Sequence, residues 1–381
     1  MKRALAIVLK VILVCAVLGA GVFLFLKKSP EQKAFDASLA RAQQGDASAQ
    51  AAVAAAYLAG TPVKQNTTQA VDWYLKSAAQ GYAPAAYELG QLYLTGDKVE
   101  RDIASGVSYL KLAAGKGHAG AQYALGRLYQ TGTEGVTQHK GQAIWLWLHA
   151  AEQGDEDARA ALEQAKAENA ELVTWVQKVF DQEKKAETDR AAAWEVAQAY
   201  QSGLWIEKDM SKAISWLEKA AAQQNVSAQY ALYGFYSQPQ GDSEPNEEKA
   251  LEYLQQAAEN GFAPAQYAVA ERIYQVAQTP EEQEIAWQWL QLASQQKDPD
   301  ALYMSGIMTM QGQGTTANAA KALQFFKQAA ELGHADAQYV LGQSYWYGVG
   351  VQPSKSLAYK WLKLARDNGN EKATKMLQEV R

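Results

Sequence analysis

A segment of about 36 residues recurs along most of this chain, and this internal repeat constrains the fold more than any other feature. The copies include GYAPAAYELGQLYLTG from Gly81, GHAGAQYALGRLYQTG from Gly117 and GHADAQYVLGQSYWYG from Gly333. Units of this length cannot bury an apolar face alone, so successive units are expected to stack. The positions that align the copies, called hinge positions below, are Gly45, Gly81, Gly117, Gly154, Thr188, Gln224, Gly261, Lys297, Gly333 and Gly369.

Two columns of residues keep a fixed distance from the hinge positions. An alanine column stands four residues after each hinge, at Ala49, Ala85, Ala121, Ala158, Ala192, Ala228, Ala265, Ala301, Ala337 and Ala373. An aromatic column stands eight residues before the hinges, at Trp73, Tyr109, Phe180, Trp216, Tyr253, Trp289, Phe325 and Trp361, with Ala37 and Leu146 as exceptions. These columns predict two helices per unit, packed as an antiparallel hairpin. Alanine lets the helices approach closely, and we expect the aromatic ring to fill the space between hairpins.

Glycines also punctuate the repeat at the ends of the predicted first helices. A left-handed residue is favoured at such ends, and glycine adopts that conformation without steric cost. These glycines are Gly60, Gly96, Gly132, Gly203, Gly312 and Gly348. With only nine prolines and almost no alternating β-branched runs, the chain is predicted to be helical throughout, without a sheet.

The pattern G-x-A-x-A-Q-x-x-L-G-x-x-Y-x-x-G, followed by a short loop and W-x-x-x-A-A-x-x-G, resembles the Sel-one-like repeat, a relative of the tetratricopeptide repeat. The resemblance covers about residues 36–381. It implies an all-α, right-handed superhelical solenoid of hairpins that serves as a protein-interaction scaffold. The expected organisation is a membrane anchor at 1–28, a capping helix at 29–44, repeats 1–4 at 45–187, and repeats 5–9 with a capping half-repeat at 188–381.

The unit from Gly154 to Glu187 departs from the pattern. Asn169 replaces the glycine that ends the other first helices, and the segment is unusually charged. We therefore interpret it as a degenerate fourth repeat, formed either by a worn hairpin or by one longer continuous helix.

An uninterrupted apolar run from Val11 to Leu26 opens the chain and can be extended to Ala4 if Lys10 reaches toward the interface. Residues 4–26 are thus predicted to form a single transmembrane helix. A cleaved signal peptide is the alternative, but no convincing small-residue cleavage site follows. Because a basic segment before an apolar run resembles an export signal, we expect a bacterial inner-membrane protein with its C-terminal repeats in the periplasm.

Charge and cysteine content exclude several functions. Residues 1–28 carry +5 and the whole chain carries −5, so the rest carries −10. An acidic body does not suit a phosphate backbone, and nucleic acid is not an expected partner. Cys15, the only cysteine, lies in the apolar run, so thiol catalysis is excluded in the repeats.

No motif for catalysis, metal binding or cofactor binding stands out. Of the four histidines, His118 and His334 each follow a hinge glycine and are interpreted as part of the repeat turn. We interpret His139 and His149 as surface residues, since they lack the companions of a metal site. The glycine pairs near Gly312 and Gly348 lack the preceding strand and the following lysine of a phosphate loop. The chain is therefore predicted to be neither an enzyme nor a cofactor-binding protein.

Partner binding is expected on the first helices, on the presumed concave face of the solenoid. A tyrosine column two residues after the alanines serves either inter-repeat packing or an aromatic binding ladder; its members are Tyr87, Tyr123, Tyr230, Tyr267, Tyr303 and Tyr339. Variable neighbours that would determine specificity are Glu88, Gln91, Arg127, Glu271 and Gln343. We expect a membrane-tethered adaptor for proteins or peptides. A role in cell-wall or polysaccharide assembly, through a glycan or a glycan-processing enzyme, is the alternative.

Overall fold

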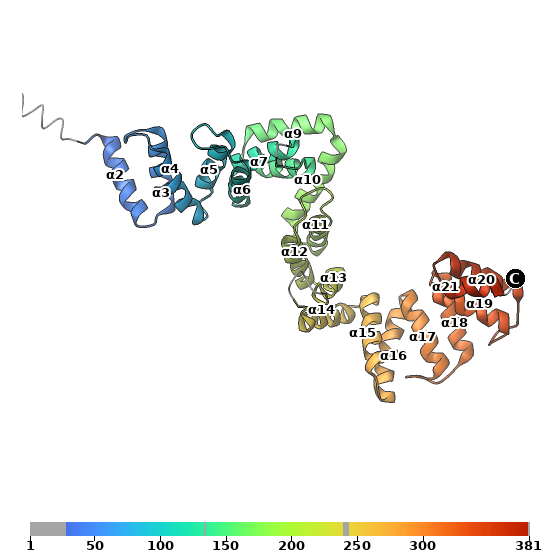
Figure 1. The fold of residues 1–381 in the computed structure, drawn as a ribbon. Coiled ribbons are helices and arrows are strands. Elements are labelled where there is room, and N and C mark those ends of the chain that lie inside the picture. Colours follow the sequence, from blue (N-terminus) through green and yellow to red (C-terminus); the bar gives the residue numbers. More distant parts are fainter. Residues whose placement is uncertain (1–27, 133–134, 239–243, 380–381) are drawn as a thin grey trace, which may run out of the picture. The chain divides into compact units, whose positions relative to one another are not determined.

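The computed structural model describes residues 28–132, 135–238 and 244–379, and within them it contains twenty α-helices and no strand. In eight units, a first helix packs side by side with the second helix that follows it, as a hairpin (Figure 1); the degenerate unit does not share this close packing. The first helices of the hairpins are α3 (Ala47–Ala59), α5 (Ala83–Thr95), α7 (Ala119–Thr131), α9 (Glu156–Glu168), α11 (Arg190–Ser202), α13 (Val226–Tyr236), α15 (Ala263–Val276), α17 (Pro299–Gln311) and α19 (Ala335–Tyr347).

The second helices are α4 (Thr67–Ala79), α6 (Ile103–Gly115), α8 (Lys140–Glu152), α10 (Ala170–Lys185), α12 (Met210–Ala222), α14 (Glu247–Glu259), α16 (Pro280–Gln295), α18 (Ala319–Glu331) and α20 (Lys355–Asp367). Before the first hairpin stands α2 (Pro30–Gln43), and after the last stands α21 (Glu371–Glu379). The chain forms two compact units. Unit 1 contains the residues up to Phe180 together with Gly203–Glu207, and unit 2 contains the remainder.

The hinge positions have the left-handed backbone that the glycines predicted. All seven hinge glycines have positive φ, from 80° at Gly81 to 98° at Gly45. Gln224 and Lys297 adopt the same conformation, with φ of 62° and 61°, although their side chains disfavour it. Because the backbone follows the alignment even where glycine is missing, the repeat register is confirmed at these nine positions. Thr188 does not share the conformation.

Residues directly after the hinges explain where first helices begin. The side chain there accepts a hydrogen bond from a backbone N–H in the first turn, which would otherwise have no partner. Asp46, Asp155, Asn225 and Asp298 act in this way. His118 and His334 act in the same way at their repeat turns, and His139 caps a second helix; all three are half-buried and accept the hydrogen bond through Nδ1. His149 packs instead against Trp145 and Phe180.

The alanine column is buried at all ten positions, with at most 3% of any residue exposed. The aromatic column meets our expectation in part, because Trp73, Trp289 and Trp361 pack against buried clusters of the preceding helices. Most of its rings, including Trp73 and Trp216, are only half-buried, whereas the following residue is buried in the core, as Tyr74 and Leu217 are. Neighbours on a helix point about 100° apart, so only one of the two can face the core.

The half-buried rings lie at the edge of the interface between helices. Tyr93 of α5 stacks on Tyr109 of α6 with ring centres 5.9 Å apart, and Tyr236 stacks on Tyr253 at the same distance. Lysine ammonium groups cover other rings, for example Lys219 at 4.1 Å from the centre of the Trp216 ring. These rings thus combine packing between helices with stacking and cation–π contacts at the surface.

A buried glutamine links successive second helices through the first helix between them. In α7, Gln122 donates to the backbone oxygen of Ala114 in α6 at 3.3 Å, and its Oε1 accepts from Gln153 after α8 at 2.8 Å. The same pair of bonds recurs at Gln50, Gln229, Gln266 and Gln338. We call this set the glutamine bridge, and it gives hydrogen-bond partners to the buried amide groups of these glutamines.

The degenerate fourth unit is made of two helices, so the alternative of one continuous helix is wrong. Asn169 ends α9, and its side-chain oxygen accepts from the backbone N–H of Leu172 in the first turn of α10. The α10 ring Phe180 packs edge-on against Trp145 of α8. Asn169 therefore breaks the helix without a glycine, because asparagine caps helices well.

Within the described residues, no helix combines the length and apolar character needed to cross a bilayer. The predicted transmembrane segment, residues 4–26, lies outside the part of the chain that the structure describes.

Candidate functional site

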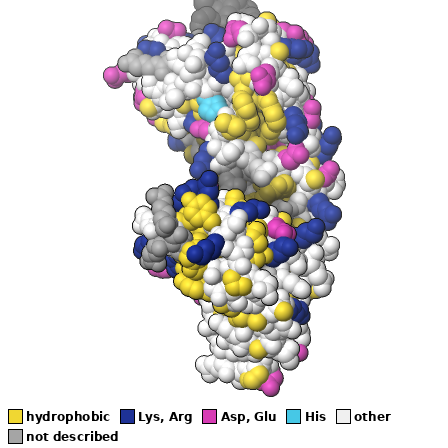
Figure 2. Space-filling model, turned by 90° about the vertical axis from the view of Figure 1, so that its right-hand side faces the viewer, with side chains coloured by type: hydrophobic (Ala, Val, Ile, Leu, Met, Phe, Trp, Pro, Cys, Tyr) yellow, Lys and Arg dark blue, Asp and Glu magenta, His cyan; other side chains and the backbone are white. Residues whose placement is uncertain are grey.

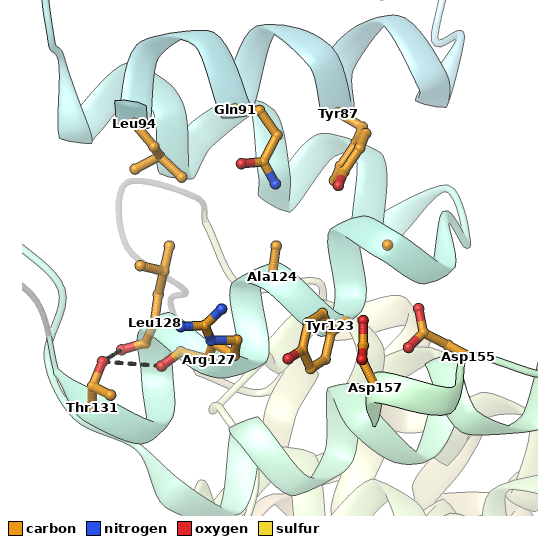
Figure 3. A pocket seen from close by; sticks show the side chains of 11 residues that line it. Tyr87, Gln91, Leu94, Tyr123, Ala124, Arg127, Leu128, Thr131, Asp155 and Asp157 are labelled. Carbon is orange, nitrogen blue, oxygen red and sulfur yellow. Dashed lines mark hydrogen bonds between the residues drawn. The ribbon is translucent and has the colours of Figure 1, made fainter. Parts of the chain in front are cut away.

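A cavity of about 480 Å³ opens in unit 1 between the first helices α5 and α7 and the start of α9 (Figure 3). It lies on the face formed by first helices, where partner binding is expected. Its lining residues are Tyr87, Gln91, Leu94, Gly120, Tyr123, Ala124, Arg127, Leu128, Thr131, Asp155 and Asp157.

Helical spacing explains why these side chains share the cavity. Tyr87, Gln91 and Leu94 follow each other by four and three residues along α5, which places them on one face of that helix. One repeat later, Tyr123 and Arg127 hold the positions of Tyr87 and Gln91 on α7. The two rows face each other across the gap between the helices (Figure 3).

The cavity changes in character along its length. Leu94 and Leu128 stand at one end, Gln91 and Arg127 come next, and the two tyrosines follow (Figure 3). At the other end, the start of α9 supplies two further lining residues, Asp155 and Asp157. The order is therefore apolar, cationic, aromatic and anionic.

Several of these polar groups have capacity to bind. Among the described residues, neither the guanidinium of Arg127 nor the side-chain amide of Gln91 has a hydrogen-bond or ion-pair partner, and Asp157 is likewise unpaired. Asp155 differs, because its Oδ1 accepts from the backbone N–H of Ala158 at 2.8 Å as the cap of α9. An exposed arginine without a carboxylate partner presents five donors in a fixed plane to an incoming acceptor.

Tyr87 has a packing contact as well as a place in the cavity. Its ring stacks on His118 with centres 4.6 Å apart, and Tyr303 stacks on His334 in the same way at 4.3 Å. The tyrosine column thus supports packing between repeats, and two of its members also line the cavity. Burial lowers the pKa of His118, although the nearby Glu88 carboxylate opposes this shift.

The structure brings together only two of the five residues expected to determine specificity. Gln91 and Arg127 line the cavity, whereas Glu88, also on α5, does not. In unit 2, Glu271 accepts from the hydroxyl of Tyr267 at 3.2 Å, and Gln343 donates to the hydroxyl oxygen of Tyr339 at 2.8 Å. These two side chains already have partners within their own helices.

Sequence reasoning missed the acidic end of the cavity. Asp155 follows the hinge Gly154 as Asp46 follows Gly45, which is enough to identify a cap. Asp157 belongs to the charged degenerate unit, which was interpreted only as a departure from the pattern. Nothing in one sequence indicated that this turn would stand beside the α7 row.

Repeated helix hairpins with caps, alanine seams and glutamine bridges define this chain as an α-helical repeat protein. The family model "Sel1 repeat" matches eight segments that together cover most of the chain, so the chain belongs to the Sel1 repeat family. Sel1 repeats generally mediate protein–protein interactions and are typically not enzymes. The matched segments are 47–82, 83–118, 119–155, 190–225, 226–262, 263–298, 299–334 and 335–370. The degenerate unit falls in the gap between the third and fourth of them.

Several solved structures are similar to this chain. A Sel1 repeat protein from Oxalobacter formigenes is 25% identical, with 94% of this chain and 92% of the other covered and a TM-score of 0.47. A protective antigen with an SLR fold, present in uropathogenic Escherichia coli strains, is also 25% identical, with 91% and 92% covered and a TM-score of 0.40. No curated protein matches the chain.

Proposed function

We propose that this protein is a membrane-tethered scaffold that holds a protein partner on the first-helix face of unit 1. The observation that carries the proposal is the cavity between α5 and α7, where the unpaired Arg127 and Gln91 side chains face a polar and aromatic lining. Groups of this kind are common in interfaces, because arginine and tyrosine are enriched among residues that contribute most binding energy.

The tether rests on the sequence of residues 4–26, whose length and apolar character suit a single membrane span. The basic flank before it favours export of the repeats, which would place them in the periplasm of a bacterial envelope. Fractionation tests this part. The full chain is expected in the membrane fraction, and the chain from residue 29 in the soluble fraction. Recovery of both from the soluble fraction would contradict the tether.

Crosslinked capture tests the scaffold function. The full chain, tagged after Arg381 and crosslinked in cells, is expected to retain one or a few proteins at stoichiometric levels. Arg127→Glu is expected to reduce this retention, since it reverses the charge at that position of the cavity. Lys64→Glu is the matched control, because Lys64 is exposed in unit 1 and does not line the cavity. Equal retention by all three chains would contradict the proposal.

A second candidate is the binding of a cell-wall glycan, or of an enzyme that processes it. Tyr87 and Tyr123 in the cavity lining favour it, because aromatic rings pair an apolar face with a polar hydroxyl, which suits a sugar. Co-sedimentation with purified cell-wall fragments tests this candidate. Retention that falls in Tyr123→Ala would support it, and absence of retention would eliminate direct glycan binding.

A further inference from the structure

The apolar, cationic, aromatic and anionic groups follow one another along the cavity, and this order restricts the kind of partner that the cavity can bind. We infer that the cavity binds an extended peptide segment that carries an acidic and a basic side chain about three residues apart, with the acidic one at Arg127 and the basic one at Asp157. This inference rests on the proposed function and specifies the ligand of the same site.

The first step of the argument is the separation of opposite charges. Arg127 lies toward one end of the lining, and the two aspartates lie at the other (Figure 3). A ligand of single charge would be attracted at one end and repelled at the other. A ligand with both charges matches both ends, which is the usual basis of electrostatic specificity.

The second step is the availability of these charges. In the described residues, the Arg127 guanidinium and the Asp157 carboxylate have no partner and do not pair with each other. Many charges elsewhere do pair, such as Arg159 with Glu156 and Arg272 with Glu247. Opposite charges left unpaired within one cavity are available to a ligand that neutralises both.

The third step is the spacing. On α7 the cavity lining begins at Gly120, and Arg127 lies seven positions further along the helix. The lining between them therefore extends roughly 10 Å at 1.5 Å per residue. An extended peptide advances about 3.3 Å per residue and covers that length in about three residues. The side chain between the two charges would lie at Tyr87 and Tyr123, and flat or aliphatic groups suit that position.

The fourth step is how close a main chain can come. Gly120 and Ala124 are the smallest residues of the α7 row, and both line the cavity. A Cβ at Gly120 would be in ordinary contact with His118 and Tyr87, at 3.4 Å and 3.5 Å, without a clash. Small side chains here leave space for a peptide backbone, which a bulky row would exclude.

Selection from a random peptide library tests the inference. Twelve-residue peptides displayed on phage would be selected against the full chain in detergent micelles, and in parallel against Arg127→Glu and Asp157→Lys. The full chain is expected to enrich peptides with an acidic and a basic residue about three positions apart. Arg127→Glu should lose the acidic preference alone, and Asp157→Lys the basic preference alone.

Synthetic peptides measure the same effect. By fluorescence anisotropy, an enriched peptide should bind about five- to tenfold more weakly when either charge is neutralised, as expected for hydrogen bonds to charged groups near a surface. Asp72→Lys is the matched control for Asp157→Lys, since Asp72 is exposed on α4 outside the cavity. It should leave the affinity unchanged.

Three results would overturn the inference: no enrichment, enrichment without paired charges, or a preference that both cavity variants leave intact. Full competition by free lysine or glutamate at equal concentration would also overturn it, because the site would then be one for small molecules. If Arg127→Glu still abolished partner capture in cells, the scaffold proposal would survive such a failure.

Discussion

Gln122 illustrates, at the scale of a single residue, how a buried polar group joins neighbouring repeats. It is 6% exposed and bonds both the Ala114 carbonyl and the Gln153 amide. Replacement by leucine removes both bonds, while the Ala114 oxygen still accepts from Gly117 and the Gln153 amide still donates to the His149 oxygen. We therefore expect Gln122→Leu to lower the free energy of unfolding by about 0.5–1.5 kcal/mol, the net contribution of ordinary hydrogen bonds. Urea unfolding measures the loss. The double variant with Gln153→Ala should lose less stability than the sum of the losses in the two single variants. A loss equal to that sum would contradict the bridge.

Gly126 tests how closely the helices approach. A Cβ at this position would lie 2.4 Å from Nε1 of the Trp147 indole, a bulky side chain packed beneath it. We expect Gly126→Ala to destabilise the protein by about 1–3 kcal/mol, because overpacking outweighs the gain in helix propensity. Gly115→Ala is the control, since a Cβ there meets nothing within 4 Å. It should be neutral or stabilising by up to about 1 kcal/mol.

His118 links stability to pH. Burial lowers its pKa, and its neutral Nδ1 accepts the capping hydrogen bond from Ala121. Because the folded pKa lies below the unfolded value of about 6.5, this residue's contribution is present above that pH and is lost as the pH falls. The urea midpoint should therefore fall less between pH 7.5 and pH 5 in His118→Asn, which keeps the cap without a titrating group. An equal fall in both proteins would contradict the assignment.

At the scale of elements, the hinges can be tested where glycine is absent. Lys297 holds φ at 61°, in a region that costs a non-glycine residue about 1–2 kcal/mol. Lys297→Gly should therefore stabilise the protein by up to about 1 kcal/mol, the remainder being offset by the greater freedom of unfolded glycine. The reverse change, Gly261→Lys, should destabilise it, although the site has open space. Thermal melting measures both, and a stabilised Gly261 variant would contradict the account.

The helices were the most predictable part of the fold. Spacing alone gave the hairpins, the buried alanine column and the register of nine hinges. The spacing did not predict which of two adjacent large residues faces the core. Trp73 and Tyr74 are both aromatic, and only the packing of the helices shows that Tyr74 is the buried one. The capping role of His118 and His334 was also missed. The sequence does indicate this role, because the same position in other repeats holds Asp46 and Asp298, and aspartate is a common helix cap.

The site was less predictable than the fold. Gln91 and Arg127 share the same place in successive repeats, so their convergence follows from the register. Asp157 was not predicted, because its place beside α7 depends on how the degenerate unit packs, and no periodic pattern describes that unit.

Exposed hydrophobic and charged side chains elsewhere on the molecule offer further candidate binding surfaces, but their pattern does not favour one of them. Figure 2 shows hydrophobic side chains exposed between lysines and arginines on one view of the molecule.

At the scale of the whole molecule, the central claim is that the first-helix face between α5 and α7 holds a protein partner. Site-specific photo-crosslinking in cells tests it most directly, with a photoreactive residue in place of Gln91 and, as control, in place of Asp72 on α4 of the same unit. We predict a discrete crosslinked protein from position 91 and none from position 72. The same adducts from both positions, or none from position 91, would contradict the account.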